Sequence, residues 1–134
     1  MTPAQIAGTT EHSQQAAFFC WANSIKKDYP MLRFMFAVPN GGERNKVAAA
    51  RLVAEGVKSG APDIFLPYPK IRNNQVLYHG LFIEMKRPKS VGLAAGRLTA
   101  NQIEFQDYLI SQNYAHIIAF DYLQAANAVL EYLN

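Results

Sequence analysis

The chain has 134 residues, of which 50% are hydrophobic and 17% are charged. This composition excludes a disordered chain and predicts a single domain over residues 1–134 with its own hydrophobic core. The net charge of +3 is compatible with an anionic partner without requiring one. No apolar run approaches the ~20 residues that span a bilayer, and residues 1–15 lack a secretion signal, so we expect a cytoplasmic protein.

The first half of the chain predicts helices and strands in alternation. Apolar residues recur at helical spacing over residues 10–29, after a threonine suited to the N-cap. Aromatic and β-branched residues predict a strand over 32–38. Alanine-rich composition predicts a second helix over 43–56, ended by a glycine, and a short strand follows at 63–66. The positions of the second helix that we expect to face inward are Val47, Ala50, Leu52 and Val53.

The second half predicts a hairpin over residues 68–79 and a strand over 80–86. A helix over 99–113 follows, and the apolar run at 115–120 has the composition of a central strand covered on both faces. A last helix begins at Asp121. The resulting order, α-β-α-β-β-α-β-α, indicates an α/β domain in which helices flank a mixed sheet.

Two charged residues interrupt the apolar strand at 80–86. Glu84 and Lys86 are two residues apart, so they lie on the same face of that strand. An antiparallel neighbour with its end near Asp63 would bring a second carboxylate beside Glu84. Two adjacent carboxylates repel each other unless a cation lies between them. The pattern therefore indicates a candidate cation site.

Carboxylate oxygens, without a cluster of Cys or His, favour Mg²⁺ or Mn²⁺ as that cation. Such sites commonly serve phosphoryl transfer, in which the cation polarises the phosphate and Lys86 orients or deprotonates the attacking water. In the alternative interpretation, Glu84 and Lys86 form a solvated pair worth less than about 1 kcal/mol. Pro62 and Asp63 are equally compatible with an ordinary turn.

Three segments, GVKSGAPDIFLP, GLFIEMKRPK and LTANQIEFQDYL, together resemble the VRR-NUC (virus-type replication-repair nuclease) domain of the PD-(D/E)XK superfamily. Pro62-Asp63 matches the PD, and residues 84–86 match the (D/E)XK. Glu11 matches the acid of the family's first helix, and residues 40–44 match its Asn-Gly-Gly-x-Arg stretch. The resemblance extends from residue 11 to residue 114 and implies a restriction-endonuclease-like fold.

The resemblance implies a metal-dependent deoxyribonuclease with Asp63, Glu84 and Lys86 at its catalytic centre. Gln102 would hold water or a phosphate there, although Thr99 and Gln102 also have the spacing of a capping box. The implied metal ligands are Glu11, directly or through water, Asp63, Glu84 and the main-chain carbonyl of Met85. The implied DNA contacts are Asn40, Gly41, Gly42, Arg44, Lys58, Ser59, Arg87, Lys89 and Arg97. As an alternative, these last residues form a turn at 40–44 and solvated side chains elsewhere.

The leading hypothesis is a structure-selective DNA endonuclease that uses Mg²⁺ or Mn²⁺, of the Holliday-junction resolvase type and active as a homodimer. The resemblance places it in DNA repair or recombination, in a bacterial or phage-infected cell. The chain shows no helix-turn-helix or zinc finger, which favours recognition of DNA shape over sequence. The alternatives are a non-cleaving DNA-binding or assembly module, or a flap, exonuclease or restriction-type enzyme. The dimer interface is left open between Phe34, Phe36 and the arm from Tyr68 to Tyr78.

Overall fold

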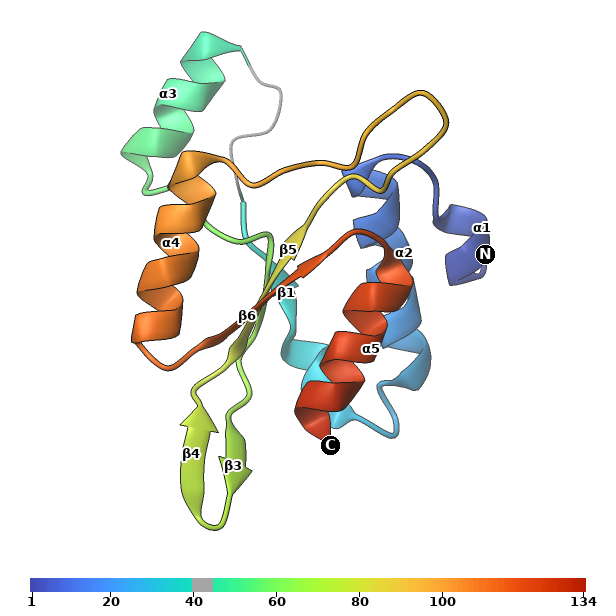
Figure 1. Cartoon of the computed structure of the whole chain (residues 1–134), viewed down its shortest axis with the longest axis vertical. Helices are drawn as coiled ribbons and strands as arrows, with labels where there is room; N and C mark the ends of the chain where they lie inside the picture. Colours follow the sequence, from blue (N-terminus) through green and yellow to red (C-terminus); the bar gives the residue numbers. More distant parts are fainter. Residues whose placement is uncertain (40–44) are drawn as a thin grey trace.

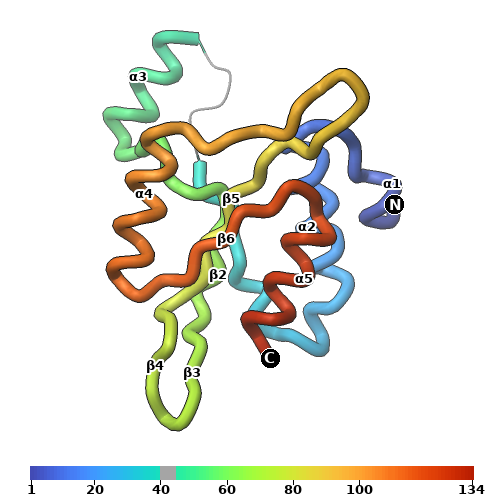
Figure 2. Tube along the Cα trace, in the orientation of Figure 1, coloured from blue at the N-terminus to red at the C-terminus, as the bar shows by residue number. Residues whose placement is uncertain are grey.

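The structure is a computed structural model, and it describes residues 1–39 and 45–134. Its centre is a four-stranded sheet with the strand order β1-β2-β5-β6 (Figures 1 and 2). The strands are β1 (Phe36–Ala37), β2 (Ile64–Leu66), β5 (Leu81–Met85) and β6 (Ala115–Ala119). The first three pair antiparallel, whereas β5 and β6 are parallel, so the predicted mixed sheet is confirmed.

Helices cover both faces of this sheet, as Figure 1 shows. α2 (Glu11–Ile25) and α5 (Tyr122–Leu133) pack together on one face, and α4 (Ala100–Ser111) lies on the other. α3 (Lys46–Ala54) lies beyond the N-terminal end of α4, and the short α1 (Pro3–Ile6) packs against α2. The predicted order of helices and strands is therefore observed, with α1, a 3₁₀ helix and a separate hairpin in addition.

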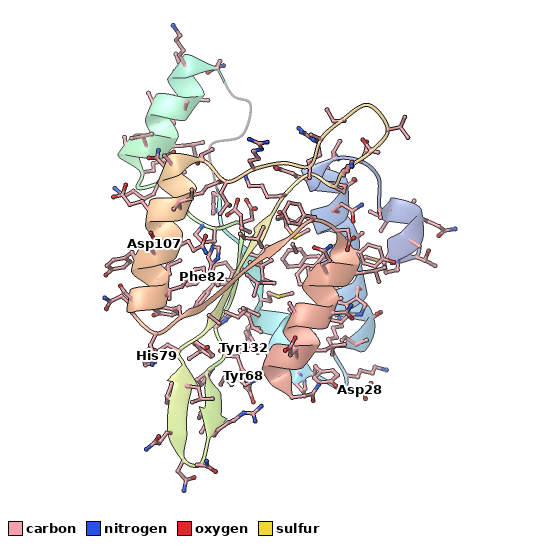
Figure 3. All side chains as sticks on the ribbon, in the orientation of Figure 1. Asp28, Tyr68, His79, Phe82, Asp107 and Tyr132 are labelled. Atoms are coloured by element: carbon pink, nitrogen blue, oxygen red, sulfur yellow. The ribbon has the colours of Figure 1, made fainter. Side chains whose placement is uncertain are left out.

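The alternation of side chains along the strands divides the sheet into two faces. Ile64 and Ile83 are cross-strand partners and are fully buried against Phe18 of α2 and Val129 of α5. On the opposite face, the rings of Phe65 and Phe82 stack with centroids 4.3 Å apart, and Figure 3 shows Phe82 between the sheet and α4. Asp63 and Glu84 therefore belong to the α4 face, because each is two residues from one of these phenylalanines.

The strand predicted over residues 32–38 is wrong in its first half. Residues Pro30–Phe34 form a 3₁₀ helix, η1, and only Phe36–Ala37 pair as β1. Pro30 fixes a backbone angle that suits the start of this helix. Leu32 and Met35, three residues apart, are both buried in the core. Because both side chains are buried at a spacing of three residues, the segment forms a 3₁₀ turn and not a strand.

The prediction that residues 115–120 form a central strand is also wrong. β6 is the last strand of the sheet and pairs only with β5 among the described residues. It is apolar because α4 and α5 pack against it from the two faces. Cover by two helices gives an edge strand the same composition as a central strand.

The predicted hairpin is confirmed, but it forms a sheet of its own. β3 (Lys70–Arg72) and β4 (Gln75–Tyr78) pair through a turn in which Asn73 and Asn74 both have positive φ. The hairpin extends away from the rest of the molecule (Figure 2). The hydroxyl of Tyr132 donates a hydrogen bond of 2.7 Å to the carbonyl of Tyr68, which anchors the base of the hairpin to α5 (Figure 3).

Candidate active site

The register between β2 and β5 brings two carboxylates together. Ile64 pairs with Ile83, so the next residues along these antiparallel strands, Asp63 and Glu84, are cross-strand neighbours on the same face. The main-chain N–H of Met85 donates a hydrogen bond of 2.7 Å to Oδ2 of Asp63. The expected convergence of Asp63 and Glu84 is therefore observed.

Glu84 is a buried acid, with only 2% of its surface exposed. Its pKa is raised from 4.5 to about 8, chiefly by burial and also by the charge of Asp63 and a hydrogen bond between the two carboxyl groups, against the lowering effect of the Lys86 charge. Without a cation, Glu84 therefore holds its proton more strongly than an ordinary carboxyl group does. A divalent cation beside the two carboxyl groups would balance both negative charges and remove their repulsion.

Lys86 lies at the end of β5 and is 6% exposed. Its Nζ is 4.0 Å from Oε1 of Glu84, and both side chains are buried. A buried ammonium beside a buried acid keeps much of its electrostatic effect, because little water screens it. This geometry excludes the solvated surface pair that the sequence left open for Glu84 and Lys86.

Gln102, in the first turn of α4, forms the capping box that the sequence suggested and also contacts Glu84 directly, a contact that was not predicted. Its Oε1 accepts a hydrogen bond of 2.8 Å from the main-chain N–H of Thr99, and the Thr99 hydroxyl accepts one from the N–H of Gln102. This capping box fixes the orientation of the amide. Nε2 of Gln102 then donates a hydrogen bond of 2.8 Å to Oε1 of Glu84.

The turn before Asp63 is fixed against the start of α4. Gly60 has φ of +87°, and a Cβ at this position would lie 2.5 Å from the main-chain carbonyl group of Asn101. Nδ2 of Asn101 donates a hydrogen bond of 3.0 Å to the Ser59 hydroxyl. Only glycine allows this close approach, which holds Gln102 and Asp63 at the same cavity.

Glu11 begins α2 and approaches the acid pair from another side. It lines two cavities that also include Asp63, one of about 540 Å³ and one of about 410 Å³ that also includes Glu84. Its charge contributes to the raised pKa of Glu84. In residues 1–39 and 45–134, however, no three His, Cys, Asp or Glu side chains are grouped closely enough to hold a metal ion together.

The donor chemistry of the site fits a divalent cation. Asp63 and Glu84 present oxygen ligands at one point, and the charge of Asp63 contributes to the raised pKa of Glu84, a repulsion that a cation would relieve. Glu11 is exposed and stands further out, a position compatible with binding through water. Met85 presents its N–H to Asp63 and buries its side chain in the core.

The five predicted DNA contacts that the structure describes differ in their surroundings. Lys58, Lys89 and Arg97 are exposed, while Ser59 lines the 410 Å³ cavity. Arg87 is engaged within the chain, since its Nε and Nη2 donate to the carbonyl of Ala94 at 3.1 and 2.7 Å. The remaining four predicted contacts, Asn40, Gly41, Gly42 and Arg44, lie outside the described residues.

The inward positions predicted for α3 are largely wrong. Val47 and Val53 are 71% and 67% exposed, Ala50 is exposed, and no residue of α3 is buried. Alanine-rich composition gives a helix but only a weak indication of which face is covered. Leu52 and Val53 instead line the 410 Å³ cavity that contains Asp63 and Glu84. Sequence reasoning missed this wall, because it treated these residues as core.

Comparison with known proteins agrees with this architecture. A mixed sheet with carboxylates on adjacent inner strands, flanked by helices, defines a PD-(D/E)XK-like nuclease fold. A solved structure titled "VRR_NUC domain protein" superposes with a TM-score of 0.72 at 23% sequence identity, covering 95% of this chain and 90% of its own. The sequence model of the VRR-NUC domain matches residues 10–119, and the chain belongs to this family. No curated protein sequence matches the chain.

The family is one of nuclease-type domains, which typically use divalent metal ions, and a nuclease domain implies DNA as the substrate. Within the described ranges, no helix is long and apolar enough to cross a membrane.

Proposed function

We propose that this protein is a metal-dependent, structure-selective DNA endonuclease that hydrolyses phosphodiester bonds. The observation that carries this proposal is the convergence of Asp63 and Glu84 on one face of the sheet, with the buried Nζ of Lys86 4.0 Å from Glu84. A buried acid with a strongly raised pKa in a cavity is a functional-site signal, because the fold gains no stability from it. The family membership supports the same reaction.

Asp63 and Glu84 would hold Mg²⁺ or Mn²⁺, with Glu11 bound through water. The bound ion would supply Lewis-acid polarisation of the scissile phosphate. Lys86 would orient the attacking water and offset the negative charge that develops on the phosphate. Gln102 would keep the Glu84 carboxylate in one orientation, since the capping box fixes the amide that donates to it.

The test is cleavage of closed circular DNA, four-way junctions, flaps and linear duplex in Mg²⁺ or Mn²⁺. We expect cleavage of the branched substrates by the wild-type protein and none by Asp63→Ala or Glu84→Ala. Asp107→Ala is the matched control, because Asp107 is an exposed acid on α4 that points away from the sheet (Figure 3). Unchanged activity in Asp63→Ala or Glu84→Ala refutes these roles.

The same assay separates the other candidate activities. A non-cleaving DNA-binding or assembly module would bind these substrates without metal-dependent hydrolysis. An exonuclease would leave closed circular DNA intact, and a restriction-type enzyme would cut linear duplex at fixed positions. The buried arrangement of Glu84 and Lys86 favours the endonuclease over the binding module, since binding alone does not require a buried acid.

The proposal includes a homodimer formed through the β3–β4 hairpin. Every residue from Ile71 to His79 is exposed, and an isolated two-stranded hairpin is only marginally stable in water. β3 carries Lys70 and Arg72, charges that protect an edge strand, whereas no residue of β4 is charged. Antiparallel pairing of β4 with β4 of a second copy would give a twofold dimer with two active sites.

Sedimentation velocity tests this interface with a matched pair of variants. Val76→Lys places a charge on β4 and should convert the dimer to a monomer. Ile71→Lys changes the cross-strand partner of Val76, an apolar residue that is also exposed but lies on the charged strand, and should leave the dimer intact. A wild-type monomer, or equal effects of the two variants, refutes pairing through β4.

A further inference from the structure

The 410 Å³ cavity beside the acid pair has two chemically different sides. The polar part of its lining includes the acids Glu11, Asp63 and Glu84 together with Gln102, Thr99 and Ser59. The other side is apolar and comes from α3 and the residue that follows it in the turn. The apolar residues are Ala49, Leu52, Val53 and Val57. A charged site and an apolar wall therefore share one space of the size that holds a small organic ligand.

The apolar wall is not part of the hydrophobic core. Val53 is 67% exposed, and none of the residues of α3 is buried. α3 also packs less extensively than the other long helices, which lie against the sheet or against one another (Figure 1). Apolar surface that is left in water beside a charged site marks a place where a ligand's own apolar surface is covered.

The charges around this wall select the chemistry of that ligand. α3 carries Lys46 and Arg51 and no acid within its bounds, with Glu55 following as its C-cap, and Lys58 follows in the next turn. All three cations are exposed. Cations around an apolar wall suit a polyanion that also presents flat apolar groups, which describes a nucleic acid with accessible bases. A second copy of this chain is not a polyanion with flat apolar groups, so it does not suit this cavity beside the acids.

We propose that the α3 wall binds the base of one unpaired nucleotide next to the scissile phosphate. The phosphate would lie at Asp63 and Glu84 while the base packs against Leu52 and Val53. A base within a duplex is stacked and paired, so it must leave the stack to reach this wall. The site therefore selects DNA with unpaired nucleotides at the cut. This inference rests on the proposed nuclease function and names the substrate feature that the same site recognises.

The test measures binding of a single-stranded oligonucleotide and of a blunt duplex of the same sequence, by fluorescence anisotropy in Ca²⁺ buffer with gel analysis showing intact DNA. Val53→Ser should weaken binding of the single strand about fivefold and binding of the duplex less than about twofold. Val53→Leu keeps an apolar wall and should bind as the wild type does. Val47→Ser is the matched control, because Val47 is an exposed valine of the same helix that does not line the cavity.

Equal binding by Val53→Ser and Val47→Ser overturns the inference, as does an equal loss of single-strand and duplex binding. Failure of the inference and failure of the nuclease proposal give different results. If the wild type cuts DNA but Val53→Ser binds normally, only the base-binding wall is wrong. If Val53→Ser weakens single-strand binding but no metal ion supports cleavage by the wild type, only the nuclease assignment is wrong.

Discussion

Replacing Glu84 with glutamine should stabilise the metal-free protein at alkaline pH. The folded protein raises the pKa of Glu84 from 4.5 to about 8. Between these two pH values the folded protein holds a proton that the unfolded chain has released, so the free energy of unfolding falls as pH rises and levels off above about pH 8. The free energy of unfolding of the Glu84→Gln variant does not fall in this way, because a glutamine side chain does not ionise. Its amide still accepts from Gln102 and can donate to Asp63 in place of the carboxyl proton.

The size of this effect follows from the pKa of Glu84. A rise from 4.5 to about 8 corresponds to at most ~5 kcal/mol, and rearrangement of the surrounding groups when the carboxyl group ionises reduces the expected difference to ~2 kcal/mol. For a chain of this length, ~2 kcal/mol corresponds to a rise in Tm of roughly 5–10 °C. We therefore expect Glu84→Gln to melt several degrees above the wild type at pH 8.5 and close to it at pH 4.5.

The assay is thermal unfolding followed by circular dichroism in EDTA across pH 4.5 to 8.5. Glu104→Gln is the control, because Glu104 is an exposed acid on α4 and should leave the Tm unchanged at every pH. The reasoning is refuted if Glu84→Gln melts below the wild type at pH 8.5, or if the difference in Tm between the two proteins is the same at every pH. A lower Tm of the variant at pH 8.5 would mean that Glu84 stabilises the fold as an ionised group.

Three further predictions concern the same site. Addition of Mn²⁺ at pH 8 should raise the Tm of the wild type and raise that of Asp63→Asn much less, since the ion would relieve the repulsion between the two carboxyl groups. Lys86→Met should lower the rate of junction cleavage about 10²- to 10³-fold while leaving junction binding, measured in Ca²⁺, within about twofold of the wild type. Thr99→Ala should lower the free energy of unfolding by ~1 kcal/mol and slow cleavage, because Gln102 loses half of its capping box. Thr99→Ser should restore both, as measured by chemical denaturation and by the cleavage assay.

The acid pair could be predicted from the sequence because strand geometry determines it. Alternation places Glu84 and Lys86 on one face, and a single antiparallel pairing of β2 with β5 brings Asp63 beside Glu84. The capping box was visible for a similar reason, since Thr99 and Gln102 interact within one helical turn. Interactions that span few residues, or that follow from a single strand register, can be predicted from the spacing of residues in the sequence.

The position of α3 and the edge location of β6 could not be predicted in this way. Composition specifies that residues 46–54 are helical, but not whether the helix packs on the sheet or stands beside the acids. Likewise, the apolar composition of residues 115–119 indicates that helices cover both faces of this strand, but it does not indicate where the strand lies in the strand order of the sheet. Tertiary contacts with distant segments decide both, and no local pattern records them. The homodimer stays a prediction, as do the metal and DNA-contact roles of individual residues.

The packing of α2 on α5 bears on the order in which the protein folds. The side chain of Gln14 donates to the carbonyl of Gly8 at 2.6 Å and accepts from the N–H of Tyr122 at 2.8 Å, a contact that spans 108 positions in the chain. Contacts of such sequence separation form slowly, because a long loop must close before they contribute. Glu11, which lines the site, is the first residue of α2. A folding intermediate that has formed the sheet alone would therefore carry both central carboxylates and still leave one side of the site open.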